Sequence, residues 1–309
     1  YEIPLCDWSS DVCSSDLSLA VSYNGLSGYA DSLYEALTRP YPAYEAIGIR
    51  NIGGDYNQLG TSLLQIENEF YGTIRPKRTV KSGERPLHAL RERGVEYVEV
   101  RLMDLDPFEP IGLNADTARF LDLFLLHCLL EDSPPDSPDE IAAVKNNQHL
   151  TAARGREPGL LLQRLGQPVT LADWAADIVG QLEPVAAAMD AQDGGRAYAD
   201  ALAAARAALA APHTLPSARV LSAMRAEHAD SFSAFVSARS LDTRARLLAL
   251  PYSADLKARF DQLAAASVAE QKRIEASDQV PFEDYRREYT SPERLGTGAR
   301  AVLAGAESV

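Results

Sequence analysis

Two stretches in the first third of the chain alternate apolar and polar side chains with a period of two, the pattern of a half-buried β-strand. They are residues 63–71 and residues 95–105. In each stretch, one face is mainly apolar and the other carries polar groups. We therefore predict two strands, connected by the basic segment 74–78, a polar loop and a short helix over residues 87–93 that Gly94 ends.

The pattern changes to long helices after Pro110. Residues 115–131 carry apolar side chains at helical spacing, which predicts a largely buried helix. Ser137 begins a capping box with Glu140, with a proline between them in the first turn, so a second helix begins there. Further helices are predicted at residues 171–190, 195–211, 217–227, 231–248 and 253–277, and a short one before Pro40.

These elements predict an α+β fold class and four parts of the chain. Residues 18–112 contain the strands, residues 113–290 form a mainly helical region, and the polar tail 291–309 is expected to fray. Residues 1–17 are set apart because residues 7–17, DWSSDVCSSDL, resemble the in-frame translation of a sequencing-library adapter. We expect this first part not to be native, and the natural gene to have continued upstream of residue 18.

Composition restricts the class of protein. The chain has 309 residues, 46% of them hydrophobic, and a formal net charge of -14. This balance is typical of an acidic globular protein and argues against nucleic-acid or anionic-membrane partners. No apolar run approaches the roughly 20 residues of a membrane-spanning helix, and residues 1–20 lack the layout of a signal peptide. We expect a cytoplasmic protein.

The polar faces of the two predicted strands carry the candidate chemistry. They hold Glu67, Glu69 and Tyr71 on the first strand, and Glu99 and Arg101 on the second. Buried carboxylates need compensation, which Mg²⁺ could give together with substrate phosphates. The planar guanidinium of Arg101 would then hold a phosphate or a carboxylate. The pattern alone favours a simpler interpretation, a solvated sheet face whose cross-strand ion pairs contribute about 0.2–1 kcal/mol each.

Three motifs follow one another in this region: LQIENEFY at 64–71, IRPKR at 74–78, and EYVEVR at 96–101 with DPF and PIG soon after it. In order and spacing they resemble the proteobacterial glutamate-cysteine ligase family, and weaker similarity extends the resemblance over residues 18–285. It implies a partial antiparallel sheet like that of glutamine synthetase. It also implies ATP-dependent ligation of the L-glutamate side-chain carboxylate to the L-cysteine amine through an acyl phosphate, the first step of glutathione biosynthesis.

The resemblance also implies a role for each polar residue of the motifs. Glu99 would bind Mg²⁺, and Arg101 would be the catalytic residue that contacts the transferred phosphate. Tyr71 would help form the cysteine pocket, while Arg75 and Lys77 would bind anionic groups of the substrates. ATP and Mg²⁺ are the implied cofactors. The further candidates are Glu67, Glu69 and Asn68.

In this family, further metal-binding carboxylates and a histidine precede the position of residue 18. We therefore expect the chain alone to be inactive and to fold poorly, and the full-length protein to be a monomer. Two alternatives stay open. One is a related carboxylate-amine ligase with another amine acceptor, and the other is a non-catalytic helical interaction module.

Overall fold

The described part of the chain is organised around two hydrophobic clusters, which belong to different groups of elements. The structure, a computed structural model, describes residues 21–101 and 103–295. The proposed foreign segment, residues 1–17, lies outside the described residues, as do residues 296–309 of the predicted tail. Within the described residues, two two-stranded antiparallel sheets accompany the helices, so the predicted α+β class is confirmed.

The first cluster belongs to the N-terminal lobe, residues 21–101. Helix α2 (Leu26–Thr38) buries Tyr29, Leu33 and Leu37, which are spaced one turn apart and therefore share one face. It ends before Pro40, as predicted, because the residue that precedes a proline avoids the helical conformation. The short helix α3 follows (Pro42–Ile47), and α4 (Pro86–Arg93) ends at Gly94, whose φ is +73°. The buried members are Val21, Tyr29, Ala30, Leu33, Ala36, Leu37, Leu64, Phe70, Leu87, Leu90 and Leu295.

The first sheet is an antiparallel pair, β1 (Ile74–Lys77) and β2 (Tyr97–Val100). The predicted second strand is confirmed by β2. The predicted strand over residues 63–71 is wrong, because this segment contains the 3-10 turn η1 (Glu67–Glu69). The strand that pairs with β2 comes instead from the segment 74–78 that we predicted as a connection. A buried ion pair between Glu67 and Arg85 explains why residues 63–71 depart from an extended strand.

The second cluster lies in the helical lobe, residues 115–210. It packs α5 (Ala115–Leu130) and α9 (Ala197–Ala210) with α7 (Leu171–Gln181) and α8 (Glu183–Asp193). The helix predicted over residues 171–190 is two helices, because Pro184 sits in the first turn of a new one. The end of α5 is exposed rather than buried as predicted. The buried members are Leu123, Val179, Leu182, Ala186 and Leu202.

Two further elements of the helical lobe follow from local sequence. Helix α6 (Pro138–Arg154) begins as predicted, and the Ser137 hydroxyl accepts a hydrogen bond from the Glu140 amide at 3.2 Å. The hairpin β3 (Leu161–Arg164) and β4 (Gln167–Thr170) was not predicted. Its two-residue turn places Leu165 and Gly166 at φ +50° and +75°, the positive values that such a tight turn requires.

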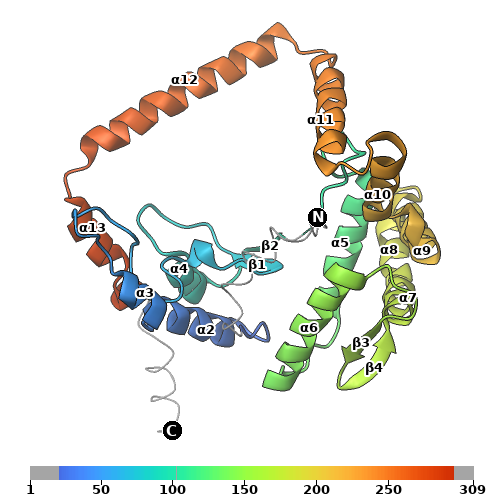
Figure 1. Cartoon of the computed structure of the whole chain (residues 1–309), viewed down its shortest axis with the longest axis horizontal. Helices are drawn as coiled ribbons and strands as arrows, with labels where there is room; N and C mark the ends of the chain where they lie inside the picture. The colour runs from blue at the N-terminus through green and yellow to red at the C-terminus, as the bar shows by residue number, and fades with distance from the viewer. Residues whose placement is uncertain (1–20, 102, 296–309) are drawn as a thin grey trace.

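The last helices return the chain to the N-terminal lobe. After η2 (Pro212–Thr214), α10 (Pro216–Glu227) and α11 (Phe232–Leu248), helix α12 (Ala254–Ser277) has no buried residue along its 24 residues. It spans about 36 Å across the open side of the molecule (Figure 1). Helix α13 (Phe282–Tyr289) and the 3-10 turn η3 (Pro292–Leu295) then pack against the N-terminal lobe. The start of the predicted frayed tail is thus folded. None of the described helices is both long and apolar enough to span a membrane.

Because the two clusters are separate, a cavity in one should not loosen the other. Leu123→Ala removes a fully buried side chain from the second cluster and should destabilise the helical lobe by about 2–5 kcal/mol. Hydrogen exchange should show faster exchange in α5, α8 and α9 with little change in α2 and α4. Leu33→Ala should give the reverse distribution. Equal loss of protection in both lobes with either variant would show that they unfold as one unit.

Candidate functional site

The antiparallel pair β1–β2, which we call the hairpin although α4 lies in its connection, gathers five of the predicted site residues. These are Tyr71, Arg75, Lys77, Glu99 and Arg101, which we call the anion cluster. Register explains the grouping: Arg75 lies directly opposite Glu99. Directly opposed residues share a face of an antiparallel pair, and so do residues two apart on one strand. Lys77 therefore joins Arg75 and Glu99 on the same face of the hairpin.

One carboxylate sits between two of the cations. The Oε2 atom of Glu99 lies 3.3 Å from Lys77 Nζ and 3.5 Å from Arg101 Nη1. The Arg101 guanidinium also lies over the Tyr71 ring, with its central carbon 4.8 Å from the ring centroid. This cation–π contact joins the end of β2 to the segment that precedes β1.

Arg75 is the buried cation of the cluster, with 7% of its surface exposed. Its Nη2 donates to the carbonyl oxygens of Phe70 and of Asn68, the latter at 3.2 Å. Its buried Nε has no hydrogen-bond partner among the described residues. Burial, with the nearby charge of Arg101, lowers the pKa of Arg75. An anionic ligand would relieve this repulsion and could satisfy the unpaired donor.

Charge balance gives the cluster its chemical character. Three cations, Arg75, Lys77 and Arg101, surround the single carboxylate of Glu99. The excess is positive although the whole chain carries a net charge of -14. Such a local excess of guanidinium and ammonium groups favours a phosphate or a carboxylate ligand.

The opposite face of the hairpin is apolar and borders a hollow at the start of helix α2. Ile74, Pro76 and Val98 line a hollow of about 190 Å³ together with Tyr23 and Tyr29. Because these apolar side chains occupy one face, the strand period turns the charged side chains to the other. The apolar and the charged side chains therefore occupy different faces of the hairpin.

The three remaining candidates lie in and around η1. The carboxylate of Glu67 is buried and bound by Arg85, with Oε2 2.7 Å from Nη2. Glu69 accepts a hydrogen bond from the Gln65 amide at 2.7 Å, so it stabilises its own turn. The side chain of Asn68 is exposed, and its carbonyl orients Arg75. Sequence periodicity had placed Glu67 and Glu69 on the strand face of Tyr71, and the structure assigns their carboxylates to other partners.

Arg85 is the residue of this region that sequence reasoning missed. It lies outside the three motifs, in a polar loop, where an arginine normally suggests a solvated side chain. In the structure its side chain is 1% exposed. The signal that could have pointed to it is Glu67, because a buried carboxylate requires a cation from another part of the chain.

Two places among the described residues offer oxygen or nitrogen ligands to a metal ion. Glu84, just before α4, and His88 and Glu92 on α4 bring their ligand atoms within 4.8 Å of one another. Arg93, however, binds both oxygens of Glu84 at 2.7 Å, which argues against a metal there. The anion cluster offers the one carboxylate of Glu99, whose buried Oε2 receives no hydrogen bond from the described residues. Because Lys77 and Arg101 also hold this atom, the single carboxylate would suit a Mg²⁺ ion only where substrate phosphates and water supply the other ligands.

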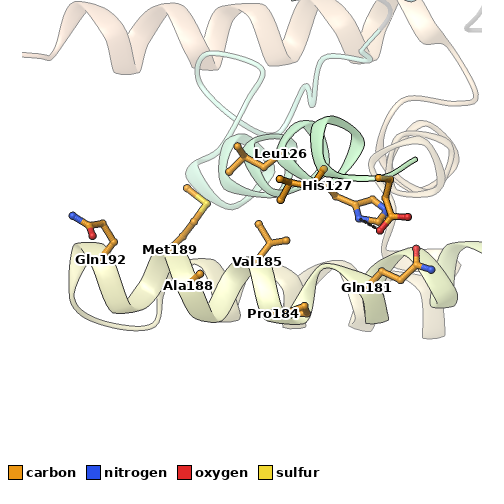
Figure 2. A pocket seen from close by; sticks show the side chains of 10 residues that line it. Leu126, His127, Gln181, Pro184, Val185, Ala188, Met189 and Gln192 are labelled. Atoms are coloured by element: carbon orange, nitrogen blue, oxygen red, sulfur yellow. Dashed lines mark ion pairs between the residues drawn. The ribbon is translucent and has the colours of Figure 1, made fainter. Parts of the chain in front are cut away.

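A larger groove of about 550 Å³ lies between α5 and α8 in the helical lobe (Figure 2). Leu126, Val185 and Met189 make it mainly apolar, and His127 pairs with Glu131 across 3.6 Å at one end. None of the predicted site residues lines this groove. The anion cluster therefore stands as the candidate site.

Comparison with known proteins agrees with the motifs. A family model described as glutamate-cysteine ligase matches residues 12–151, which include the whole anion cluster. The glutamate-cysteine ligase of Azotobacter vinelandii is 46% identical over 91% of this chain and 54% of its own length. That of Bordetella parapertussis is 46% identical over 88% and 51%. The solved structure of the Francisella tularensis enzyme in complex with AMP matches 89% of this chain and 54% of its own, with a TM-score of 0.83 and 33% identity. This chain thus spans about half the length of the curated relatives it matches.

The phenol of Tyr29, beneath the hairpin, should make the stability of the N-terminal lobe sensitive to high pH. Burial raises the pKa of Tyr29 to about 12. In the unfolded chain the phenol ionises near its ordinary pKa of about 10, so unfolding becomes more favourable as pH rises from 10 to 12. Urea unfolding should show a loss of up to about 3 kcal/mol in this interval that Tyr29→Phe reduces. Tyr252→Phe, at an exposed ring, should leave it unchanged, and an equal loss in Tyr29→Phe would refute the assignment.

Proposed function

Because this chain belongs to the glutamate-cysteine ligase family, we propose that it forms part of an enzyme that joins the side-chain carboxylate of L-glutamate to the amine of L-cysteine, using ATP. The observation that carries this proposal is the anion cluster. The reaction passes through an acyl phosphate, so its site must hold phosphate and carboxylate groups. A positively charged hairpin face with one carboxylate suits that requirement.

In this proposal Arg101 is the catalytic residue of the described half of the site. Its guanidinium supports the negative charge on the phosphoryl group as it passes from ATP to the glutamate carboxylate. The Tyr71 ring fixes Arg101 from below and contributes a wall to the cysteine pocket. Arg75 and Lys77 bind the anionic groups of the substrates, and the unpaired Nε of Arg75 is the donor ready for that contact. Positioning and electrostatics are the contributions these residues make.

The proposed cofactors are ATP and Mg²⁺. The Francisella tularensis relative was solved with AMP, which supports a nucleotide site in this family. Glu99 would supply one oxygen ligand to Mg²⁺, and the bound ion would neutralise phosphate oxygens. Its carboxylate also holds Lys77 and Arg101 in place before the nucleotide arrives.

We further propose that the full-length protein is a cytoplasmic monomer whose activity requires the length present in its relatives and absent here. The alternatives make different demands. A related ligase with another amine acceptor would keep the phosphate chemistry of Arg101 and change the pocket at Tyr71. A non-catalytic helical module would give no reason for the excess positive charge of the hairpin.

The anion cluster should bind phosphate and MgATP through Arg101. We expect Arg101→Ala to weaken the binding of both ligands to the 309-residue chain by about 10- to 100-fold, because a charge-assisted contact is lost. Isothermal titration calorimetry would measure it. Arg101→Lys should fall between wild type and Ala, since it keeps the charge without the planar fork.

Arg196→Ala is the matched control for the loss of one positive charge. The Arg196 side chain is 81% exposed on the helical lobe and pairs only loosely with Asp200, at 3.8 Å. The Arg196→Ala variant should bind phosphate with the same affinity as wild type. If both variants bind phosphate equally weakly, the loss of affinity comes from the change in net charge and not from Arg101 itself. If Arg101→Ala binds phosphate as tightly as wild type, the proposed role is contradicted.

The chain by itself should lack ligase activity. The described site supplies one carboxylate, Glu99, to a reaction that must hold the metal-bound triphosphate of ATP as well as two amino acids. Phosphate release from ATP should therefore show no dependence on L-cysteine when L-glutamate is present. A cysteine-dependent rate that disappears in Arg101→Ala would show that half the relatives' length is enough.

A further inference from the structure

Arg85 is the centre of a buried polar network in the N-terminal lobe. Its side chain is 1% exposed and that of its partner Glu67 is 6% exposed. Arg85 Nε lies 2.9 Å and Nη2 lies 2.7 Å from Glu67 Oε2, and the Leu87 amide donates to Glu67 Oε1 at 3.3 Å. Two buried charges are thus paired with each other and with backbone, which fixes both side chains firmly.

The last part of the described chain completes this network. Residues 282–295, which contain α13 and η3 and which we call the C-terminal strap, reach Arg85 through Tyr289. Arg85 Nη1 donates to the Tyr289 carbonyl, and its guanidinium lies over the Tyr289 ring, 4.4 Å from the centroid. The strap is also held by Arg286, which donates to the Leu59 carbonyl at 2.6 Å, and by the buried Leu295.

On its other side, the network leads directly to the anion cluster. Glu67 is the first residue of η1, and its carbonyl accepts the Phe70 amide at 3.2 Å, which closes the turn. The carbonyls of Asn68 and Phe70 then hold the Arg75 guanidinium. The next residue is Tyr71, whose ring lies beneath Arg101. Every step from Tyr289 to Arg101 is therefore a direct contact or a chain neighbour.

We propose that Arg85 is a positioning residue for the anion cluster, and that the C-terminal strap sets the affinity of the cluster for phosphate through the contact of Tyr289 with Arg85. The inference rests on the proposed function in one respect, that the cluster binds phosphate. With the strap docked, Arg85 holds Glu67, η1 holds Arg75 and Tyr71, and the cations converge. With Tyr289 removed, Arg85 loses its ring contact and the turn can shift.

Reciprocity gives the proposal a second consequence. If docking of the strap raises phosphate affinity, phosphate binding must stabilise the docked strap by the same factor. Wild-type protein can report this without any substitution. Saturating inorganic phosphate should slow hydrogen exchange in residues 282–289 and 64–71 as well as in the hairpin itself.

The decisive experiment compares two substitutions at one position in the 309-residue chain. Tyr289→Leu removes the ring above Arg85 and Tyr289→Phe keeps it, while both retain the carbonyl. We expect Tyr289→Leu to weaken inorganic phosphate binding by about fivefold or more. Tyr289→Phe should stay within about twofold of wild type. Tyr252→Leu, the same change at an exposed ring outside the strap, should also stay within about twofold.

A second variant covers the case in which Tyr289→Leu does not fold. Arg85→Lys keeps the charge and loses the planar fork, so it should weaken phosphate binding in the same direction. The inference is overturned if wild type binds phosphate and yet neither Tyr289→Leu nor Arg85→Lys changes the affinity. It is also overturned if phosphate protects the hairpin and leaves residues 282–289 unchanged. Failure of wild type to bind phosphate at all would instead overturn the proposed function, and the coupling with it.

Discussion

The N-terminal lobe depends on the buried ion pair between Glu67 and Arg85. Taking two charges out of water is unfavourable unless each finds a full set of partners. Here the partners come from three regions of the sequence, since Arg85 lies 18 residues from Glu67 and 204 residues from Tyr289. The full set of partners therefore forms only when the turn η1, the start of α4 and the end of α13 come together. This requirement favours one arrangement of the three segments, whereas apolar packing alone would allow several.

The two faces of the β1–β2 hairpin carry different kinds of side chain, apolar on one face and charged on the other. Ile74, Pro76 and Val98 line the hollow beside Tyr23 and Tyr29, and the charged side chains occupy the other face, where Arg75 also donates to two backbone carbonyls. Because Glu99 is shared by Lys77 and Arg101, the cations are held apart at fixed positions and their repulsion is reduced. A phosphoryl-transfer site needs this kind of arrangement, with charge that is fixed before the ligand arrives. The resemblance named these residues, and the register of the hairpin places Arg75, Lys77 and Glu99 on one face.

Sequence periodicity predicted what depends on near neighbours. It placed Glu99 and Arg101 on one face of a strand, and it located the Ser137 cap, because strand alternation and capping involve residues a few positions apart. It was wrong over residues 63–71, where alternation suggested a strand and a partner 18 residues away imposed a turn. It also missed β1, because Pro76 argues against a central strand although it is tolerated in a strand at the edge of a sheet. The roles of Arg75 and Lys77 came from the resemblance, and only the register of the hairpin places both beside Glu99.

Helix α12 has a consequence for how the chain can vary. A flexible linker absorbs an extra residue, whereas each residue in a helix adds about 1.5 Å of length and rotates the rest of the chain by about 100° around the helix axis. One residue inserted into or deleted from α12 would therefore present α13 to the N-terminal lobe on a different side. The exposed surface of α12 leaves most of its individual side chains open to substitution. Its residue number, by contrast, is fixed by the separation of the two lobes, so α12 acts as a spacer of defined length and rotational phase.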